Sequence, residues 1–91
     1  MQDTSVATVN LVYLARLREA FGRSGEAFAL GNGEATVGAL LAALRARGGA
    51  FAQELAPGRA IRVAVNHTMA GDDTAIASGD EVAVFPPVTG G

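Results

Sequence analysis

The hydrophobic and polar positions of the chain predict four strands. Each is a short run in which β-branched, aliphatic or aromatic residues recur at close spacing. The runs lie at 9–14, 26–30, 61–65 and 81–85. Residues 69–76 contain a glycine followed by two aspartates, and we expect at most a short strand or a 3₁₀ turn there.

One longer helix is predicted between the second and third strands. Thr36 is a suitable N-cap, and the apolar residues after it recur at the spacing of a single helix face. These apolar residues are Val37, Leu40, Leu41 and Leu44. Arg45 and Arg47 are expected in the last turn, where positive charge is favourable, and the glycines at 48–49 are expected to stop the helix.

The order of elements is strand, strand, helix, strand, short strand and strand, with short helical turns at 16–21 and 50–55. A hairpin, a helix that crosses it and returning strands make one mixed sheet with one main helix packed on one face, so the predicted class is α+β. This is the β-grasp arrangement of four to five strands, with the first and last strands parallel at its centre. We expect a flexible lead-in at 1–6, the domain at 7–85 and an extended tail at 86–91.

Strand alternation predicts which residues face the helix and which face away. The residues expected to face the helix are Val9, Leu11, Tyr13, Val82 and Val84. The residues between them form an uncovered apolar face, and these are Val12, Leu14, Ala83 and Phe85. With Arg62 at its rim, we expect this face to bind a protein partner beside the tail. Arg16, Arg18 and Glu19 are candidates for either a partner contact or a local ion pair.

The composition excludes several kinds of chemical site and ligand. The 91 residues suffice for one small domain, and the lack of cysteine excludes disulfides, thiolate metal sites and a cysteine nucleophile. Seven arginines, no lysine and nine acidic residues give a net charge of −2, and their distribution along the sequence offers no basic patch. Nucleic-acid binding is therefore not expected. His67 and the pair Asp72–Asp73 are expected to be solvated, so we expect no metal site.

The start of the chain has no feature of a targeting segment. It lacks the basic and apolar regions of a signal peptide, and no stretch approaches the roughly 20 apolar residues of a membrane span. We therefore expect a cytoplasmic protein without a membrane partner.

The final segment is Phe85-Pro86-Pro87-Val88-Thr89-Gly90-Gly91. The two prolines lack an N–H and have a fixed φ, so they end the strand and stiffen the tail. The two glycines have no Cβ and fit a channel that any other side chain would block. At polyproline rise, the tail reaches roughly 19 Å beyond the last strand. We expect it to deliver its terminal carboxylate into another protein's active site, and an ordinary mobile terminus is the alternative.

Three stretches carry a family resemblance. They are Leu14-Ala15-Arg16-Leu17-Arg18-Glu19, Ala64-Val65-Asn66-His67-Thr68, and the segment from Gly79 through Phe85-Pro86-Pro87 to Gly90-Gly91. They resemble the ubiquitin-like sulfur carriers, and most closely the small subunits of molybdopterin synthase. The resemblance extends from about Ala7 to the end of the chain.

The resemblance implies a carrier, which is not an enzyme by itself. In this family an activating enzyme related to the ubiquitin activators (E1-like) uses ATP to adenylate the terminal glycine, here Gly91. A sulfur donor then converts it to a thiocarboxylate, so the charged chain would hold a 1-thioglycine at Gly91 and no permanently bound cofactor. The carrier docks on the large synthase subunit, in a heterotetramer, and gives sulfur to a cyclic pyranopterin phosphate in molybdenum cofactor biosynthesis.

The same resemblance implies roles for individual residues. Gly90 is the slim approach to the reactive end, and Phe85 is an interface residue. Leu14 stands where the family often has an aromatic contact. The further residues expected to contact the partner are Pro86, Pro87, Val88, Thr89, Val12, Ala83 and Arg62.

Other functions remain open at the level of sequence. Carriers for thiamine or amino-acid biosynthesis also end in Gly-Gly, although the Phe-Pro-Pro approach favours molybdopterin. A non-catalytic β-grasp interaction module is a second alternative, and a modifier that is conjugated to other proteins is a third. An autonomous enzyme is disfavoured, because the sequence presents no nucleophile–base pair.

Overall fold

The computed structural model describes residues 7–31 and 36–87, and within them the chain forms five strands and three helices. They are β1 (Ala7–Tyr13), α1 (Arg16–Phe21), β2 (Gly25–Leu30), α2 (Val37–Arg45), α3 (Gly49–Glu54), β3 (Arg62–Val65), β4 (Thr68–Ala70) and β5 (Glu81–Phe85). The expected lead-in at 1–6 lies outside the described residues, so the division into lead-in, domain and tail stays a prediction.

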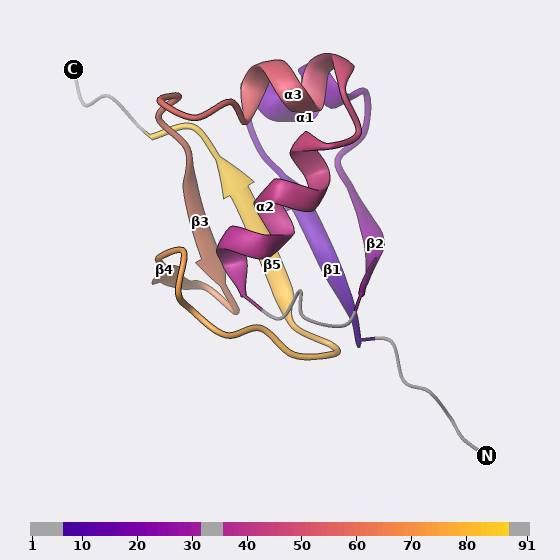
Figure 1. Ribbon diagram of the computed structural model, residues 1–91, viewed down its shortest axis with the longest axis vertical. Helices are drawn as coiled ribbons and strands as arrows, with labels where there is room; N and C mark the ends of the chain where they lie inside the picture. Colours follow the sequence, from indigo (N-terminus) through magenta and orange to yellow (C-terminus); the bar gives the residue numbers. More distant parts are fainter. Residues whose placement is uncertain (1–6, 32–35, 88–91) are drawn as a thin grey trace.

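The strands form one mixed sheet in the order β2-β1-β5-β3-β4. β1 and β5 run parallel at its centre, whereas the other neighbouring strands pair antiparallel. Figure 1 shows α2 crossing one face of this sheet, with α1 and α3 at the end where the chain leaves β5. The predicted α+β fold of the β-grasp type is confirmed, and the short helical turns predicted at 16–21 and 50–55 are the helices α1 and α3.

The core lies between the sheet and α2. Every residue of β1 and β5 that was predicted to face the helix is buried, with at most 2% of its surface exposed. From the helix, Val37, Leu40 and Leu44 pack into the same cluster, and Leu41 lies partly buried at its margin. Because side chains alternate along a strand, burying one set fixes the other set on the opposite face of the sheet.

The main helix is confirmed, but its end differs from the prediction. The Thr36 hydroxyl accepts a hydrogen bond from the Ala39 N–H at 3.2 Å, as an N-cap should. The helix ends at Arg45, and Arg47 lies beyond it, so the expectation that Arg47 occupies the last turn is wrong. Its guanidinium instead reaches Glu26 on β2, a contact between distant segments that sequence spacing does not reveal.

A tight hairpin adds the edge strand β4. Asn66 and His67 have φ values of 50° and 71°, the left-handed values that a two-residue type I′ turn requires at both central positions. β3 and β4 pair antiparallel around this turn, with Val65 opposite Thr68. The short strand allowed for within 69–76 is therefore confirmed, and it begins one residue earlier than expected.

Candidate functional site

The chain leaves the sheet at the end of β5. Phe85 is the last residue of that strand and lies opposite Arg62 of β3. Pro86 and Pro87 follow and are half-buried, and neither has an N–H that could extend the hydrogen-bond ladder. The root of the tail is thus held against the domain. The remaining predicted tail residues lie outside the described residues, and these are Val88, Thr89, Gly90 and Gly91.

An apolar patch faces away from α2 beside this root. Val12 of β1 lies opposite Ala83 of β5, whose neighbours in the strand are buried in the core. Leu14 follows β1, its N–H donates to the Val84 carbonyl at 3.2 Å, and its side chain is 42% exposed. With half-buried Phe85 and the exposed Arg62 opposite it, the structure brings the predicted set together on adjoining strands. That this set binds a partner stays a prediction.

Two further residues extend this patch and were missed in the sequence. Ala64 of β3 lies opposite Ala83, and Met69 of β4 lies opposite Ala64. Met69 is 58% exposed. The signal that would have found it is the Asn66-His67 pair, because a two-residue turn fixes the register of the strand that follows. We call the residues Val12, Leu14, Ala64, Met69, Ala83 and Phe85 the open face.

A strained turn connects β1 to α1. Ala15 has φ 54° and ψ −133°, a conformation that favours glycine. The Leu17 N–H donates to the Leu14 carbonyl at 3.1 Å and closes the turn around Ala15. The positive φ at its first central position makes this a turn of the type II′ kind. It directs Leu14 to the open face and places Arg16 at the start of α1.

A second turn places another arginine nearby. The Arg59 N–H donates to the Ala56 carbonyl at 3.0 Å, across Pro57 and Gly58. Gly58 has φ 92°, so proline and glycine occupy the two central positions of a type II turn, which suit them. Arg59 is therefore the last residue of a turn of defined type, and Arg16 is a central residue of another.

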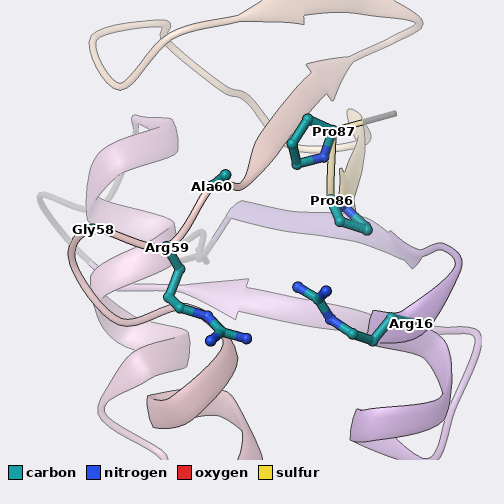
Figure 2. Close-up of a pocket in the computed structure, with 6 residues that line it drawn as sticks. All are labelled: Arg16, Gly58, Arg59, Ala60, Pro86 and Pro87. Carbon is teal, nitrogen blue, oxygen red and sulfur yellow. The ribbon is translucent and has the colours of Figure 1, made fainter. Parts of the chain in front are cut away.

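These two arginines line a hollow of about 350 Å³ at the root of the tail. Its lining residues are Arg16, Gly58, Arg59, Ala60, Pro86 and Pro87. Figure 2 shows the guanidinium groups of Arg16 and Arg59 pointing toward one another beneath the two prolines. The sequence pointed to Arg16 as a candidate contact but gave no sign of Arg59, which comes from a distant segment.

The two guanidinium groups share one carboxylate. Arg16 Nε and Arg59 Nη2 both donate to Glu54 Oε1, at 3.2 and 3.0 Å. The side chain of Glu54 is 17% exposed, whereas those of Arg16 and Arg59 are 54% and 47% exposed. Arg16 thus pairs with Glu54 of α3 and not with a neighbour on its own helix. We call Arg16, Glu54 and Arg59 the open triad.

A second triad has the same composition. Glu26 of β2 accepts from Arg23 at 3.2 Å and from both Nη groups of Arg47, at 2.8 and 3.0 Å. The Tyr13 hydroxyl donates to the same carboxylate at 2.7 Å. Hydrogen bonds from Arg47, ahead of smaller contributions from Tyr13 and Arg23, hold the pKa of Glu26 below its usual value of 4.5. Burial raises the pKa of Tyr13 well above its usual range.

Aromatic rings cover this second triad. The Arg47 guanidinium lies 5.1 Å from the ring centre of Phe28 and 4.8 Å from that of Phe51. Phe51 stacks on Phe21 with ring centres 4.1 Å apart, and Phe21 meets Tyr13 edge-on at 4.8 Å. We call Arg23, Glu26 and Arg47 the closed triad, because both oxygens of its carboxylate accept hydrogen bonds from within the fold.

Folding gathers the positive charge at one end of the domain. All seven arginines lie on the short helices, at the last residue of α2, or on the turns and strand ends near where the chain leaves β5 (Figure 1). The described carboxylates at that end are Glu19, Glu26 and Glu54. Those at the opposite end, near the start of β5, are Asp72, Asp73, Asp80 and Glu81. The described part of the tail end therefore has a surplus of four positive charges, although four of the seven arginines are in ion pairs. The expectation that the chain does not bind nucleic acid stays a prediction.

The other candidate residues are solvent-exposed. The His67 side chain is 84% exposed, and its Nε2 lies 3.8 Å from a Glu81 carboxylate oxygen. Asp72 and Asp73 are exposed as well. Across residues 7–31 and 36–87, no three histidine or carboxylate side chains are placed to hold a metal ion together. Nor is any helix in those ranges both apolar and long enough for a bilayer span.

A protein-family model described as the ThiS family matches residues 11–91. This chain belongs to the ThiS family. The match begins within β1 and runs to residue 91, so it takes in the open face, the open triad and the tail.

Two curated relatives match this ThiS-family chain along almost their whole length. A Haemophilus influenzae protein named molybdopterin synthase sulfur carrier subunit is 37% identical over 83 residues, which is 91% of this chain and 99% of the relative. An Escherichia coli protein of the same name is 36% identical over the same shares of both chains. The resemblance to small subunits of molybdopterin synthase is thereby confirmed.

Solved structures confirm the fold. The HVO 2177 protein of Haloferax volcanii has a TM-score of 0.81 and 30% identity, covering 100% of this chain and 92% of its own. Small archaeal modifier protein 1 of the same organism has a TM-score of 0.67 and 32% identity, covering 90% of this chain and 99% of its own. Caldiarchaeum subterraneum ubiquitin, at 18% identity and a TM-score of 0.59 over 96% of this ThiS-family chain and 100% of its own, shares the fold.

Proposed function

We propose that this chain is the sulfur carrier of a molybdopterin synthase. The observation that carries the proposal is its end-to-end similarity to relatives of that name, which extends over 99% of their length. In this proposal Gly91 is the reactive residue, and Gly90 gives it a slim approach to the partner's active site. The acceptor, a cyclic pyranopterin phosphate, is bound by the large synthase subunit.

The chemistry follows from the carboxylate of Gly91. An α-carboxylate has a pKa of about 3.5, so at neutral pH it is an anion that resists nucleophiles. Attack of a carboxylate oxygen on the α-phosphorus of ATP forms an acyl-adenylate and releases pyrophosphate. A sulfur donor at the oxidation level of sulfide then forms the C–S bond while the C–O bond to AMP breaks. Since the chain has no cysteine, it can carry sulfur only in such an installed group.

The open face is the proposed docking surface for the large subunit. It spans β5 and the flanking strands β1 and β3, with Met69 on β4 beyond them, so a partner bound there sits beside the root of the tail. Burial of Phe85 in such an interface would contribute about 1.5–3 kcal/mol. Phe85→Ala should weaken binding to the large subunit by about tenfold or more, measured by calorimetry. An unchanged affinity would exclude the open face as the docking surface.

The reaction is tested by intact mass. The chain is incubated with the activating enzyme, ATP and a sulfur donor, and the expected mass gain is that of one oxygen replaced by sulfur. A chain that lacks Gly91 is the matched control and should show no gain. A second control carries one bulky residue after position 91, which leaves the fold intact but blocks the end. Sulfur transfer by that blocked chain, with no processing, would refute the proposal.

Two experimental outcomes would assign the chain to a different function. Recovery of a thiazole synthase in place of the large synthase subunit on co-purification would assign the chain to thiamine biosynthesis. Isopeptide-linked targets in cells would assign it to protein modification. That second candidate is favoured by the 32% identity to a protein named small archaeal modifier protein 1.

A further inference from the structure

The open triad contains donors that the fold does not use. Two guanidinium groups face one carboxylate, so the cluster has one positive charge in excess. Both hydrogen bonds fall on Glu54 Oε1 and use a single N–H group from each arginine. In residues 7–31 and 36–87, neither Arg16 nor Arg59 pairs with another carboxylate. Each guanidinium carries five N–H donors, so most of them remain available.

The two arginines are held in position by the backbone. Arg16 follows the strained turn at Ala15, and Arg59 follows the turn closed across Pro57 and Gly58. Glu54, which is largely buried at the end of α3, fixes the guanidinium groups from behind. Because these groups are already oriented, binding an anion between them loses less side-chain entropy than binding to free arginines.

The position of the open triad at the root of the tail indicates which molecule would supply such an anion. Pro86 and Pro87 line the same hollow, so a protein that takes up the tail must pass close to both arginines. The tail end also has the surplus of positive charge described above, whereas the opposite end is acidic. A partner surface with acidic side chains would be attracted to the end that presents the tail.

We infer that the open triad binds an aspartate or glutamate side chain of the protein that receives the tail. This inference rests on the proposed function and names one contact of that interface. A second carboxylate beside Glu54 would balance the two arginines, with Arg16 and Arg59 donating to it through the groups that face the hollow. The contact guides the root of the tail and takes no part in the sulfur chemistry.

The test compares matched arginine variants. Arg16→Gln combined with Arg59→Gln should weaken binding to the large synthase subunit by about tenfold at low ionic strength, and by less at physiological salt. Arg23→Gln is the control, because it removes an arginine of equal exposure from the closed triad. It should leave the affinity within about twofold. A double variant that binds like the unsubstituted chain, or a control that loses as much, would overturn the inference.

A third variant is expected to change the affinity for the large subunit in the opposite direction. Glu54→Gln keeps a side-chain oxygen that can accept from and orient both arginines but removes the negative charge that competes for them, so it should bind the large subunit more tightly than the unsubstituted chain. A loss as great as that of the arginine variant would show that the triad supports the fold and binds no partner. Thermal melting of each variant separates a folding defect from a binding defect.

The chain's own terminal carboxylate and the phosphates of RNA are two other possible sources of the anion, and experiments can distinguish them from a partner's side chain. A chain with a carboxamide at Gly91 lacks the terminal charge, and the arginine substitutions should lower its affinity by the same factor. If their effect disappears there, the arginines hold the chain's own terminus and the inference fails. Binding of single-stranded RNA that the double variant loses would equally overturn it. No binding of the unsubstituted chain to the large subunit would refute the proposed function as well, whereas intact binding without an arginine effect refutes the inference alone.

Discussion

The closed triad and the open triad have the same composition and carboxylates of nearly equal exposure, 15% for Glu26 and 17% for Glu54. They differ in how fully their groups are used. Four donors reach both oxygens of Glu26, and aromatic rings cover Arg47. At Glu54 two donors converge on a single oxygen. The two triads therefore differ in the number of hydrogen bonds that their carboxylates accept, more than in burial, and a binding role is proposed only for the open triad.

The largest expected effect is the loss of the closed triad. Arg47→Ala removes two hydrogen bonds to a carboxylate and the contact with two aromatic rings, so the free energy of unfolding should fall by about 2 kcal/mol. Arg59→Ala, the matched change in the open triad, should lower it by less than about 0.5 kcal/mol. Urea denaturation measures both. Equal losses would contradict the distinction between the two triads.

The next effect concerns the charge on Glu26. Glu26→Gln should lower the free energy of unfolding at neutral pH by about 1.5 kcal/mol, because hydrogen bonds to a charged group are replaced by weaker ones. In the unsubstituted chain this carboxyl has a lowered pKa, so its contribution is complete above the usual value of 4.5 and is lost as the pH falls through the folded value.

Denaturation at several acidic pH values checks this sign. The stability of the unsubstituted chain should decline with acidification more steeply than that of Glu26→Gln. Parallel curves would show that Glu26 has no part in the decline.

A smaller effect of opposite sign is expected at Ala15, which places Arg16 of the open triad. Ala15→Gly relieves a backbone conformation that costs a non-glycine residue about 1–3 kcal/mol, against an entropic loss of about 0.5–1 kcal/mol. The free energy of unfolding should therefore rise by about 1 kcal/mol. Ala20→Gly, within α1, is the control and should lower it by about 1 kcal/mol. A loss at both positions would exclude strain at Ala15.

The smallest expected effect is on stability when either arginine of the open triad is replaced, and it tests the distinction between the two triads most directly. Arg16→Gln and Arg59→Gln should each change the free energy of unfolding by less than about 0.5 kcal/mol, although together they are expected to weaken partner binding. Thermal melts of the same samples that are used for calorimetry provide this measurement. A destabilisation as great as that of Arg47→Ala would mean that the open triad is as structural as the closed one.

Most of the fold could be predicted because local patterns of hydrophobic and polar residues determine its strands and main helix. The alternation in 9–13 and 81–85 identified the central strands and assigned their faces, and the stripe from Val37 to Leu44 identified the main helix. These patterns depend on neighbours in sequence, and a residue's burial follows directly from its place in them. Four of the six residues of the open face, Val12, Leu14, Ala83 and Phe85, were predictable for the same reason.

The charged features could not be predicted in this way. Glu26 meets Arg47, and Glu54 meets Arg16, only after the sheet and short helices have packed. An arginine is compatible with many positions at a helix end, so the assignment of Arg47 to the last turn was reasonable on local grounds and wrong in the fold. The gathering of all seven arginines at one end is likewise a consequence of topology.

The tail continues from the middle of the sheet. β5 is bonded to β1 on one edge and to β3 on the other, so tension on Pro86 would load both ladders at once. Force along the strands would then load the hydrogen bonds of both ladders together, so they would not break one after another. In the proposed function, a partner that draws the end of the chain into its active site would therefore exert force on the domain without separating its strands one hydrogen bond at a time.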